Sequence, residues 1–162
     1  MIVRHDQGQA ISRLVRCADG KDLVRAMLLT STRARPRAPV DVLSDYDVVL
    51  VLEGIRPFFE PRSWLEHFGA VLVAYRDEIE PEPDPGVEQT GNVVQYADGL
   101  KLGFRLWPVV LLRRIADAAA LPDELDAGYV VLLDKDRFTD DLDPPTFETY
   151  VPDRPDEGAY LT

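Results

Sequence analysis

Apolar residues recur along the chain at two spacings, one typical of helices and the other of strands. Ala10, Ile11, Leu14 and Val15 repeat at the helical period and predict an amphipathic helix over residues 7–17. Other apolar runs predict strands over residues 23–30, 46–53, 70–75, 92–97, 100–107 and 129–133, and helices over residues 61–68 and 109–119. We expect the strand over residues 70–75 to be buried.

The pair Asp98-Gly99 is the strongest short hairpin signal in the chain and should connect the two strands that flank it. In the second of these strands, alternation predicts one buried face and one polar face. The buried face consists of Leu100, Leu102, Phe104 and Leu106, and the other of Lys101, Gly103 and Arg105.

In two segments the apolar residues recur at neither the helical nor the strand spacing. Residues 77–92 interleave prolines with acidic residues, which predicts an extended loop. Residues 139–162 are acidic and proline-rich, which predicts an irregular tail. We therefore expect one domain over residues 1–138, followed by this tail.

Charge and composition exclude several classes of protein. The net charge of −11 would repel a nucleic-acid backbone, so we expect no nucleic-acid partner. No apolar run approaches the roughly 20 residues that cross a bilayer, and the first residues lack the apolar core of a signal peptide. A cytoplasmic protein without a membrane partner is the expectation. One cysteine and two histidines predict neither an internal disulfide nor a zinc site.

The candidate chemistry begins with two aspartates, Asp45 and Asp47, at the start of the strand predicted over residues 46–53. Alternate side chains of a strand share a face, so both carboxylates point the same way. Two neighbouring carboxylates repel each other unless a cation lies between them, and such hard oxygen ligands suit Mg²⁺ that carries phosphates. Acidic residues also end strands merely because the strand reaches solvent, and the pair alone leaves both interpretations open.

More motifs follow in a fixed order. They are the segment 26–49, which contains Ser31-Thr32-Arg33 and Asp45-Tyr46-Asp47, then Ser63–Gly69, Asp98-Gly99, Pro108 and Val131–Asp136. In this order, residues 8–155 resemble the aminoglycoside 6-adenylyltransferase (streptomycin adenylyltransferase) family of the polymerase-β-like nucleotidyltransferase superfamily. The resemblance implies an α+β fold with a mixed, twisted sheet of about five strands and helices packed on one face.

The resemblance also implies a reaction, the transfer of AMP from Mg-ATP to a hydroxyl of a streptomycin-type aminoglycoside, which confers antibiotic resistance. Asp45 and Asp47 would be the catalytic residues and the metal ligands. Ser31 and Thr32 would form a turn whose amides hold the phosphates, as helix N-termini do, and Arg33 would bind a phosphate. Bound Mg²⁺ would neutralise charge and activate the acceptor hydroxyl.

Three departures from the family pattern bear on activity. The Gly-Ser turn of the family is Ser31-Thr32 here, which removes the glycine that lets backbone approach a phosphate. The third carboxylate position falls on Gly103, and Arg105 follows on the same face about 7 Å away, as a candidate phosphate-binding residue. The helical C-terminal domain of the family has no counterpart up to Thr162.

Two functions therefore stay open at this point. One is an adenylyltransferase catalytic domain, and the other is an inactive remnant of the fold that binds nucleotide or another protein. The expected partners are ATP and a cationic aminoglycoside, which an acidic surface attracts. A homodimer or a partner chain that covers the C-terminal side is a further expectation, since the family's helical domain would lie there.

Overall fold

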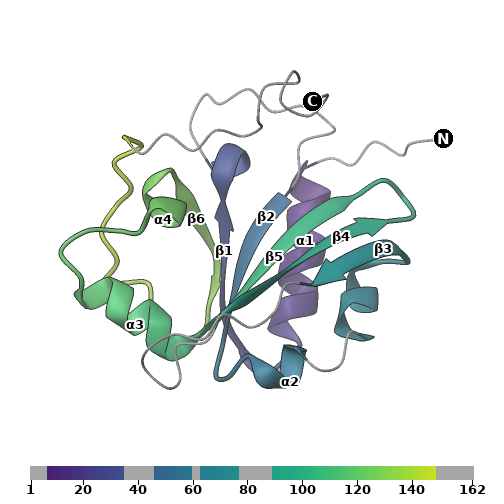
Figure 1. Ribbon diagram of the computed structural model, residues 1–162, viewed down its shortest axis with the longest axis horizontal. Helices are drawn as coiled ribbons and strands as arrows, with labels where there is room; N and C mark the ends of the chain where they lie inside the picture. Colours follow the sequence, from purple (N-terminus) through teal and green to yellow (C-terminus); the bar gives the residue numbers. More distant parts are fainter. Residues whose placement is uncertain (1–6, 35–45, 60–62, 77–88, 149–162) are drawn as a thin grey trace, which may run out of the picture.

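Six strands form one mixed sheet in the computed structural model, which describes residues 7–34, 46–59, 63–76 and 89–148 (Figure 1). The strands are β1 (Val24–Thr30), β2 (Tyr46–Leu52), β3 (Val71–Arg76), β4 (Thr90–Tyr96), β5 (Lys101–Pro108) and β6 (Tyr129–Asp134). Their order is β3-β4-β5-β2-β1-β6. The pair β2 and β5 at the centre is parallel, and the other neighbours are antiparallel.

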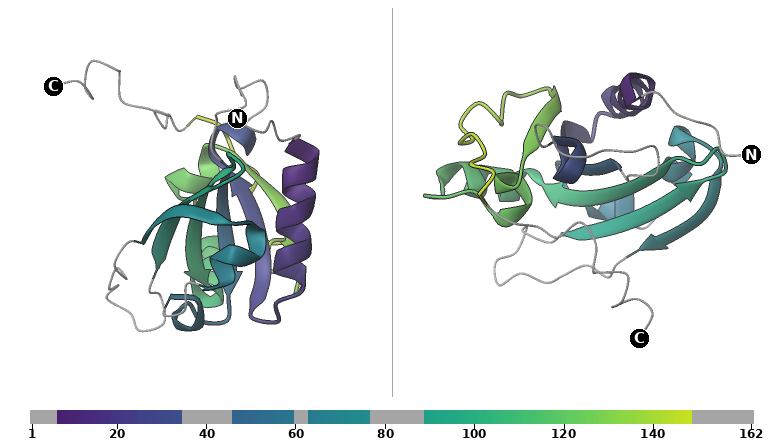
Figure 2. Two further views of the ribbon diagram at one scale, coloured as in Figure 1. Left: turned by 90° about the vertical axis from the view of Figure 1, so that its right-hand side faces the viewer. Right: turned by 90° about the horizontal axis from the view of Figure 1, so that it is seen from above.

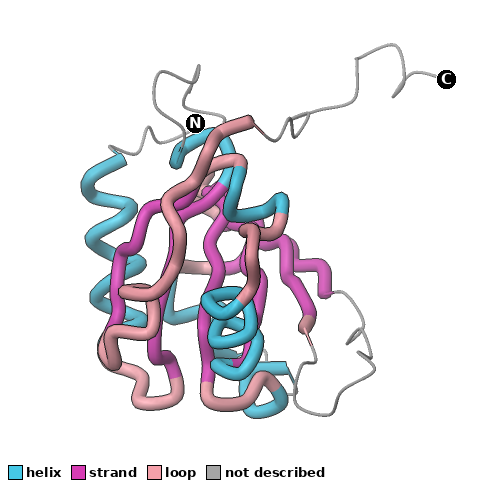
Figure 3. The backbone as a smooth tube through the Cα atoms, turned by 90° about the vertical axis from the view of Figure 1, so that its left-hand side faces the viewer, coloured by secondary structure: helices cyan, strands magenta, loops and turns pink. Residues whose placement is uncertain are grey.

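The helices lie on both faces of this sheet. They are α1 (Gln7–Asp19), α2 (Arg56–Phe59), α3 (Val109–Asp117) and α4 (Asp123–Asp126), with the 3-10 helices η1 (Ser31–Ala34) and η2 (Ser63–Phe68). Figure 2 shows α1 along one face. Leu14 of α1 belongs to one apolar core, whereas Leu112 of α3 belongs to a second core on the opposite face. Figure 3 shows α1 and α3 on either side of the strands.

Strand β2 is apolar on both of its faces because each face packs in one of the two cores. Its Leu50 side chain packs in the core of α1, and Val51 packs in the core of α3. Both are at most 1% exposed. A strand buried on both faces has a nearly continuous apolar sequence, as Val48–Leu52 has.

The expected α+β fold with a mixed sheet is confirmed. The sheet has six strands rather than about five, and α3 lies on the face opposite to α1, so the helices do not share one face. The hairpin at Asp98-Gly99 forms as predicted, since Gly99 adopts a positive φ of 97° and the Asp98 carboxylate accepts a bond from the Leu100 amide. The alternation predicted for β5 is also confirmed by its burial pattern.

The prediction of a buried strand over residues 70–75 is wrong. Strand β3 lies at one edge of the sheet, and Leu72 and Tyr75 are 65% and 69% exposed. Its apolar run looks like that of a central strand, and sequence alone does not say which apolar strand ends a sheet.

The predicted irregular segments are described only in part. Residues 77–88 and 149–162 lie outside the described residues. Residues 139–148 form no helix or strand, but Leu142 is buried in the core of α3, and the Thr146 hydroxyl donates to the Asp126 carboxylate at 2.8 Å. The domain boundary at residue 138 stays a prediction. Within the described part of the chain, no helix is long and apolar enough to cross a membrane.

Candidate functional site

Asp47 lies in the middle of a row of side chains that crosses the sheet. The Cα partners in this row, strand by strand, are Tyr129 (β6), Thr30 (β1), Asp47 (β2), Gly103 (β5), Val93 (β4) and Tyr75 (β3). Partners in register project from the same face of a sheet. The row therefore lies on the face that α3 covers further along, where Val49 and Val51 of β2 are buried.

Thr30 fixes one side of Asp47. This threonine is 6% exposed, and its hydroxyl donates to the Asp47 carbonyl oxygen at 3.3 Å. Because Thr30 ends β1, the chain passes directly from this contact into η1, where the predicted phosphate turn Ser31-Thr32 lies. Paired Cα atoms lie about 4.5–5.5 Å apart and successive Cα atoms 3.8 Å, so the Ser31 Cα is at most about 9.3 Å from that of Asp47. One phosphate group can span that gap.

Gly103 fixes the other side of Asp47. The two residues pair across the parallel β2–β5 contact. A Cβ atom added at Gly103 would stand 2.7 Å from the Asp47 Oδ1 atom, closer than real Cβ contacts allow. Because glycine has no Cβ atom, the Asp47 carboxylate can occupy this space. Any side chain at residue 103 would adjoin the Asp47 carboxylate, and the assignment of this residue as the third carboxylate position stays a prediction.

Arg33 stacks on Tyr46, next to the site but on the other face of the sheet. Its guanidinium carbon lies 3.8 Å from the centroid of the Tyr46 ring. Tyr46 is 3% exposed and belongs to the core of α1, whereas Asp47 follows it and projects from the opposite face. The stack therefore fastens η1 to the start of β2. A direct contact of Arg33 with phosphate, which the sequence suggested, stays a prediction.

Arg105 projects from the same face as Gly103 and is exposed. Its neighbours in register are Val49 and Gly91. Two residues of strand separate it from the Gly103 position, about 7 Å. The guanidinium can thus reach an anion held near Asp47. Asp45, the other predicted metal ligand, lies outside the described residues, as do Arg35 and Arg37.

The donor set suits one magnesium ion held together with a substrate. Mg²⁺ commonly takes one or two carboxylates, with phosphates and waters completing its octahedron. Asp47 supplies one carboxylate, and a second from Asp45 stays a prediction. Within the described residues, no cluster of three or more His, Cys, Asp and Glu side chains could hold a metal ion. Gly103 has no side-chain oxygen. The described residues of this row therefore do not supply the third carboxylate that a second ion would need.

Two members of this arrangement were missed from the sequence, Thr30 and Tyr46. A threonine that ends an apolar strand just before the turn was a signal for the first. For Tyr46, strand alternation predicts only that its side chain lies on the face opposite to Asp47. Nothing in the sequence shows that Arg33 stacks on it.

Other polar and aromatic side chains that invite a functional interpretation have structural roles. The Asp134 carboxylate accepts bonds from the Phe138 and Thr139 amides and from the Thr139 hydroxyl, so it closes a turn after β6. Asp136 pairs with Arg25 at 2.6 Å, and this contact lowers the pKa of the Asp136 carboxyl. The aromatic residues Trp64, Tyr96 and Trp107 are at most 5% exposed, so they pack inside the protein.

Comparisons of the sequence and of the fold with known proteins both find aminoglycoside adenylyltransferases. The sequence profile of the family described as streptomycin adenylyltransferase matches residues 4–162. The chain is 29% identical to the aminoglycoside 6-adenylyltransferase of Bacillus subtilis (strain 168) over 133 residues, which are 82% of this chain and 45% of that enzyme. It thus spans less than half the length of this relative.

The fold is similar to that in the crystal structure of an aminoglycoside 6-adenyltransferase from Bacillus subtilis. The TM-score is 0.52 at 19% sequence identity, and the match covers 70% of this chain and 39% of that one. At this identity the likeness concerns the fold alone. It supports the α+β fold with a mixed sheet.

Proposed function

This chain belongs to the streptomycin adenylyltransferase family, and from that premise we propose that its Asp47 site binds Mg-ATP and transfers AMP to a hydroxyl of a cationic aminoglycoside. The hydroxyl oxygen would bond to the α-phosphorus and lose its proton, and pyrophosphate would leave. The observation that carries the proposal is the register of three strands. It places the Asp47 carboxylate between Thr30, which leads into the Ser31-Thr32 turn, and the open position at Gly103.

Each residue has a definite task in this proposal. Asp47, with Asp45, would hold a magnesium ion, which when bound neutralises the triphosphate and acidifies the attacking hydroxyl. The backbone of Ser31 and Thr32 would donate to the phosphates, as amides at the start of a helical turn do. Arg105 would bind phosphate oxygens from the side of β5, where the third carboxylate is missing.

The charge of the chain favours the proposed acceptor. With a net charge of −11, the surface attracts a polycation over distances near the Debye length, about 8–10 Å in ordinary buffer. The same charge opposes ATP, so phosphate binding depends on local groups such as Arg105 and on the bound cation.

Gly103 favours a second function, nucleotide binding without transfer. A third carboxylate would help to activate the acceptor hydroxyl, so its absence should lower the rate of transfer more than the affinity for ATP. In this alternative Arg105 takes over part of the charge neutralisation, and the chain acts as a nucleotide-binding protein of the same fold.

One experiment decides between the two. The protein is incubated with ATP, Mg²⁺ and a panel of aminoglycosides, the products are analysed by mass spectrometry, and ATP affinity is measured in parallel by calorimetry. A mass increase of one AMP on an aminoglycoside, lost in Asp47→Asn, supports transfer. Magnesium-dependent ATP binding without a product supports the second function. If neither ATP binding nor product is found, both proposals fail.

A further inference from the structure

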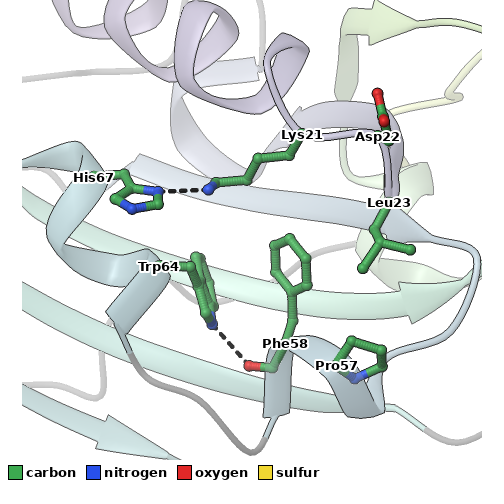
Figure 4. A pocket seen from close by; sticks show the side chains of 7 residues that line it. All are labelled: Lys21, Asp22, Leu23, Pro57, Phe58, Trp64 and His67. Carbon is green, nitrogen blue, oxygen red and sulfur yellow. Dashed lines mark hydrogen bonds between the residues drawn. The ribbon is translucent and has the colours of Figure 1, made fainter.

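A second candidate binding site lies at the other end of the sheet, where β1 begins and β2 ends. Figure 4 shows a pocket between the turn before β1, helix α2 and the 3-10 helix η2. Its volume is about 330 Å³, near the lower end of the roughly 300–1,000 Å³ that ligand pockets have. The side chains that line it include Lys21, Leu23, Pro57, Phe58, Trp64 and His67. Asp47 stands five residues before Leu52 on β2, which is about 17 Å of strand, so the two sites are separate.

The floor of this pocket is apolar and rigid. The rings of Phe58 and Trp64 lie 5.2 Å apart, and both side chains are less than 9% exposed. The Trp64 indole nitrogen donates to the Phe58 carbonyl oxygen at 2.7 Å. This bond fixes η2 against α2, so the floor is formed before any ligand binds. A planar apolar group of matching size can stack there without a large ordering cost.

A cationic donor stands at one side of that floor. The Lys21 ammonium group is hydrogen-bonded to Nδ1 of His67. Because an ammonium group only donates, Nδ1 accepts, and His67 holds the ammonium group in place. Lys21 has two further N–H bonds, and the described part of the chain shows no other acceptor for them. Lys21 thus presents donors to an acceptor above the rings.

The charges around the pocket select the kind of acceptor. The Lys135 ammonium group donates to the Lys21 carbonyl oxygen at 2.9 Å, and Arg25 donates to that of Asp22 at 3.0 Å, so further cations support this turn. Asp22 also lines the pocket, although Figure 4 shows its carboxylate turned away from the rings. One nearby negative charge opposes a dianion such as a phosphate monoester more than a monoanion, and Lys21 opposes a cation.

From the apolar floor and the free donors of Lys21 we propose that this pocket binds a small aromatic carboxylate, with the ring on Phe58 and Trp64 and the carboxylate on the Lys21 ammonium group, which His67 holds in place. A ligand with one ring and one carboxylate has about nine non-hydrogen atoms, for which a dissociation constant on the order of 1 mM is expected. The proposal does not depend on the adenylyltransferase function, because the two sites share no residue.

NMR spectroscopy of ¹⁵N-labelled protein tests the proposal, since the chain has two tryptophans. The indole signal of Trp64 reports on the pocket, and that of Trp107, which belongs to the core of α3 on the opposite face, serves as the internal control. Sodium benzoate is titrated to about 10 mM, ten times the expected constant. Benzamide provides the same ring without charge.

We expect benzoate to shift the Trp64 signal saturably and to leave the Trp107 signal in place. Benzamide and the variant Lys21→Met should each weaken binding about tenfold or more, the size of one charge-assisted hydrogen bond. The control variant Lys101→Met removes the same charge from β5 and should bind like the parent protein. If Lys21→Met does not fold, the comparison of benzoate with benzamide on the parent protein still decides.

Three results would overturn the proposal. They are no shift of the Trp64 signal at the highest benzoate concentration, equal and linear shifts of both indole signals, and equal affinity for benzoate and benzamide. ATP with Mg²⁺ should not change the affinity for benzoate, whatever the outcome of the adenylylation experiment.

Discussion

The two ends of strand β2 lie in different surroundings although the strand has only seven residues. At the Leu52 end, Leu50, Val51 and Leu52 are at most 1% exposed, and both cores cover them. At the other end, the half-buried Asp47 is the only charged residue of the strand. Burial accounts for every apolar residue of β2, but it gives no reason for a carboxylate in a strand with neighbours on both sides. Desolvation makes that position costly for a charge.

The difference between the ends separates folding from function within one element. Residues at the Leu52 end should determine stability, and Asp47 should determine ligand binding at little cost to stability. Sites that bind ligands often depart from what the fold alone would select. Each prediction below tests this separation, beginning with the largest expected effect.

The variant Leu50→Ala should lower the free energy of unfolding by about 2–5 kcal/mol, since it leaves a cavity in a strand buried on both faces. Asp47→Asn should change it by less than about 1 kcal/mol, because the amide keeps the shape of the side chain. Urea denaturation of the two variants and the parent measures both values. A loss in Asp47→Asn as large as in Leu50→Ala would show that Asp47 serves the fold, and the separation of the two ends would fail.

Substitutions at Gly103 should change Mg-dependent ATP binding in opposite directions. Gly103→Asp adds the same Cβ atom as any other side chain, so Asp47 must rotate away from it, but it also adds a second carboxylate for the ion. Binding should therefore tighten about ten- to hundredfold, equivalent to roughly 1–3 kcal/mol. Gly103→Ala adds only the Cβ atom that would stand 2.7 Å from Asp47 Oδ1. It should displace that carboxylate and weaken binding.

Calorimetry with and without Mg²⁺ measures these affinities. Asp47→Asn, alone or with Gly103→Asp, is the control and should remove the gain. Equal affinities in all variants would show that residue 103 is not the third ligand position. Tighter binding in Gly103→Ala would contradict the inference that glycine leaves space for the Asp47 carboxylate.

The sequence predicted the faces of single strands better than it predicted which strands are neighbours. Alternation, a local signal, put Gly103 on the polar face of its strand, whereas the pairing of Gly103 with Asp47 came only from the sheet. The edge position of β3 was not predicted, because its apolar run gives no information on the neighbours of a strand. The stack of Arg33 on Tyr46 was missed for a related reason, since it joins residues 13 positions apart across a segment without a period.

The hydrogen bond of Tyr96 gives a smaller test in the core of α1, on the face of the sheet opposite to Asp47. The Tyr96 hydroxyl donates to the Leu65 carbonyl oxygen at 2.8 Å, and burial raises the pKa of the phenol above its ordinary value of 10. Tyr96→Phe should cost about 1 kcal/mol at neutral pH.

The raised pKa of Tyr96 also predicts a dependence on pH. Stability from this group is complete below pH 10 and falls as pH rises further, because the unfolded chain then releases a proton that the folded chain keeps. Urea denaturation between about pH 8 and 11 should therefore show a steeper loss in the parent than in Tyr96→Phe. Tyr75→Phe, at a tyrosine that is 69% exposed, should follow the parent, and parallel curves for all three proteins would refute the argument.

The last prediction distinguishes two roles of Arg33 at the Asp47 end, the fastening of η1 to β2 and a direct contact with phosphate. If Arg33 acts by fastening η1 to β2, removal of either partner of the stack should weaken ATP binding by the worth of a partly buried cation–π contact, about 0.5–2 kcal/mol. Arg33→Gln and Tyr46→Leu should then have effects that do not add in the double variant, since both break the same contact. If Arg33 instead contacts phosphate, Arg33→Gln should weaken ATP binding in the Tyr46→Leu background as much as in the parent. Calorimetry of ATP with Mg²⁺ on the four proteins distinguishes these results, and unchanged affinity in both single variants would exclude Arg33 from the site. We expect the non-additive result, because the ring that holds this guanidinium projects from the face opposite to Asp47.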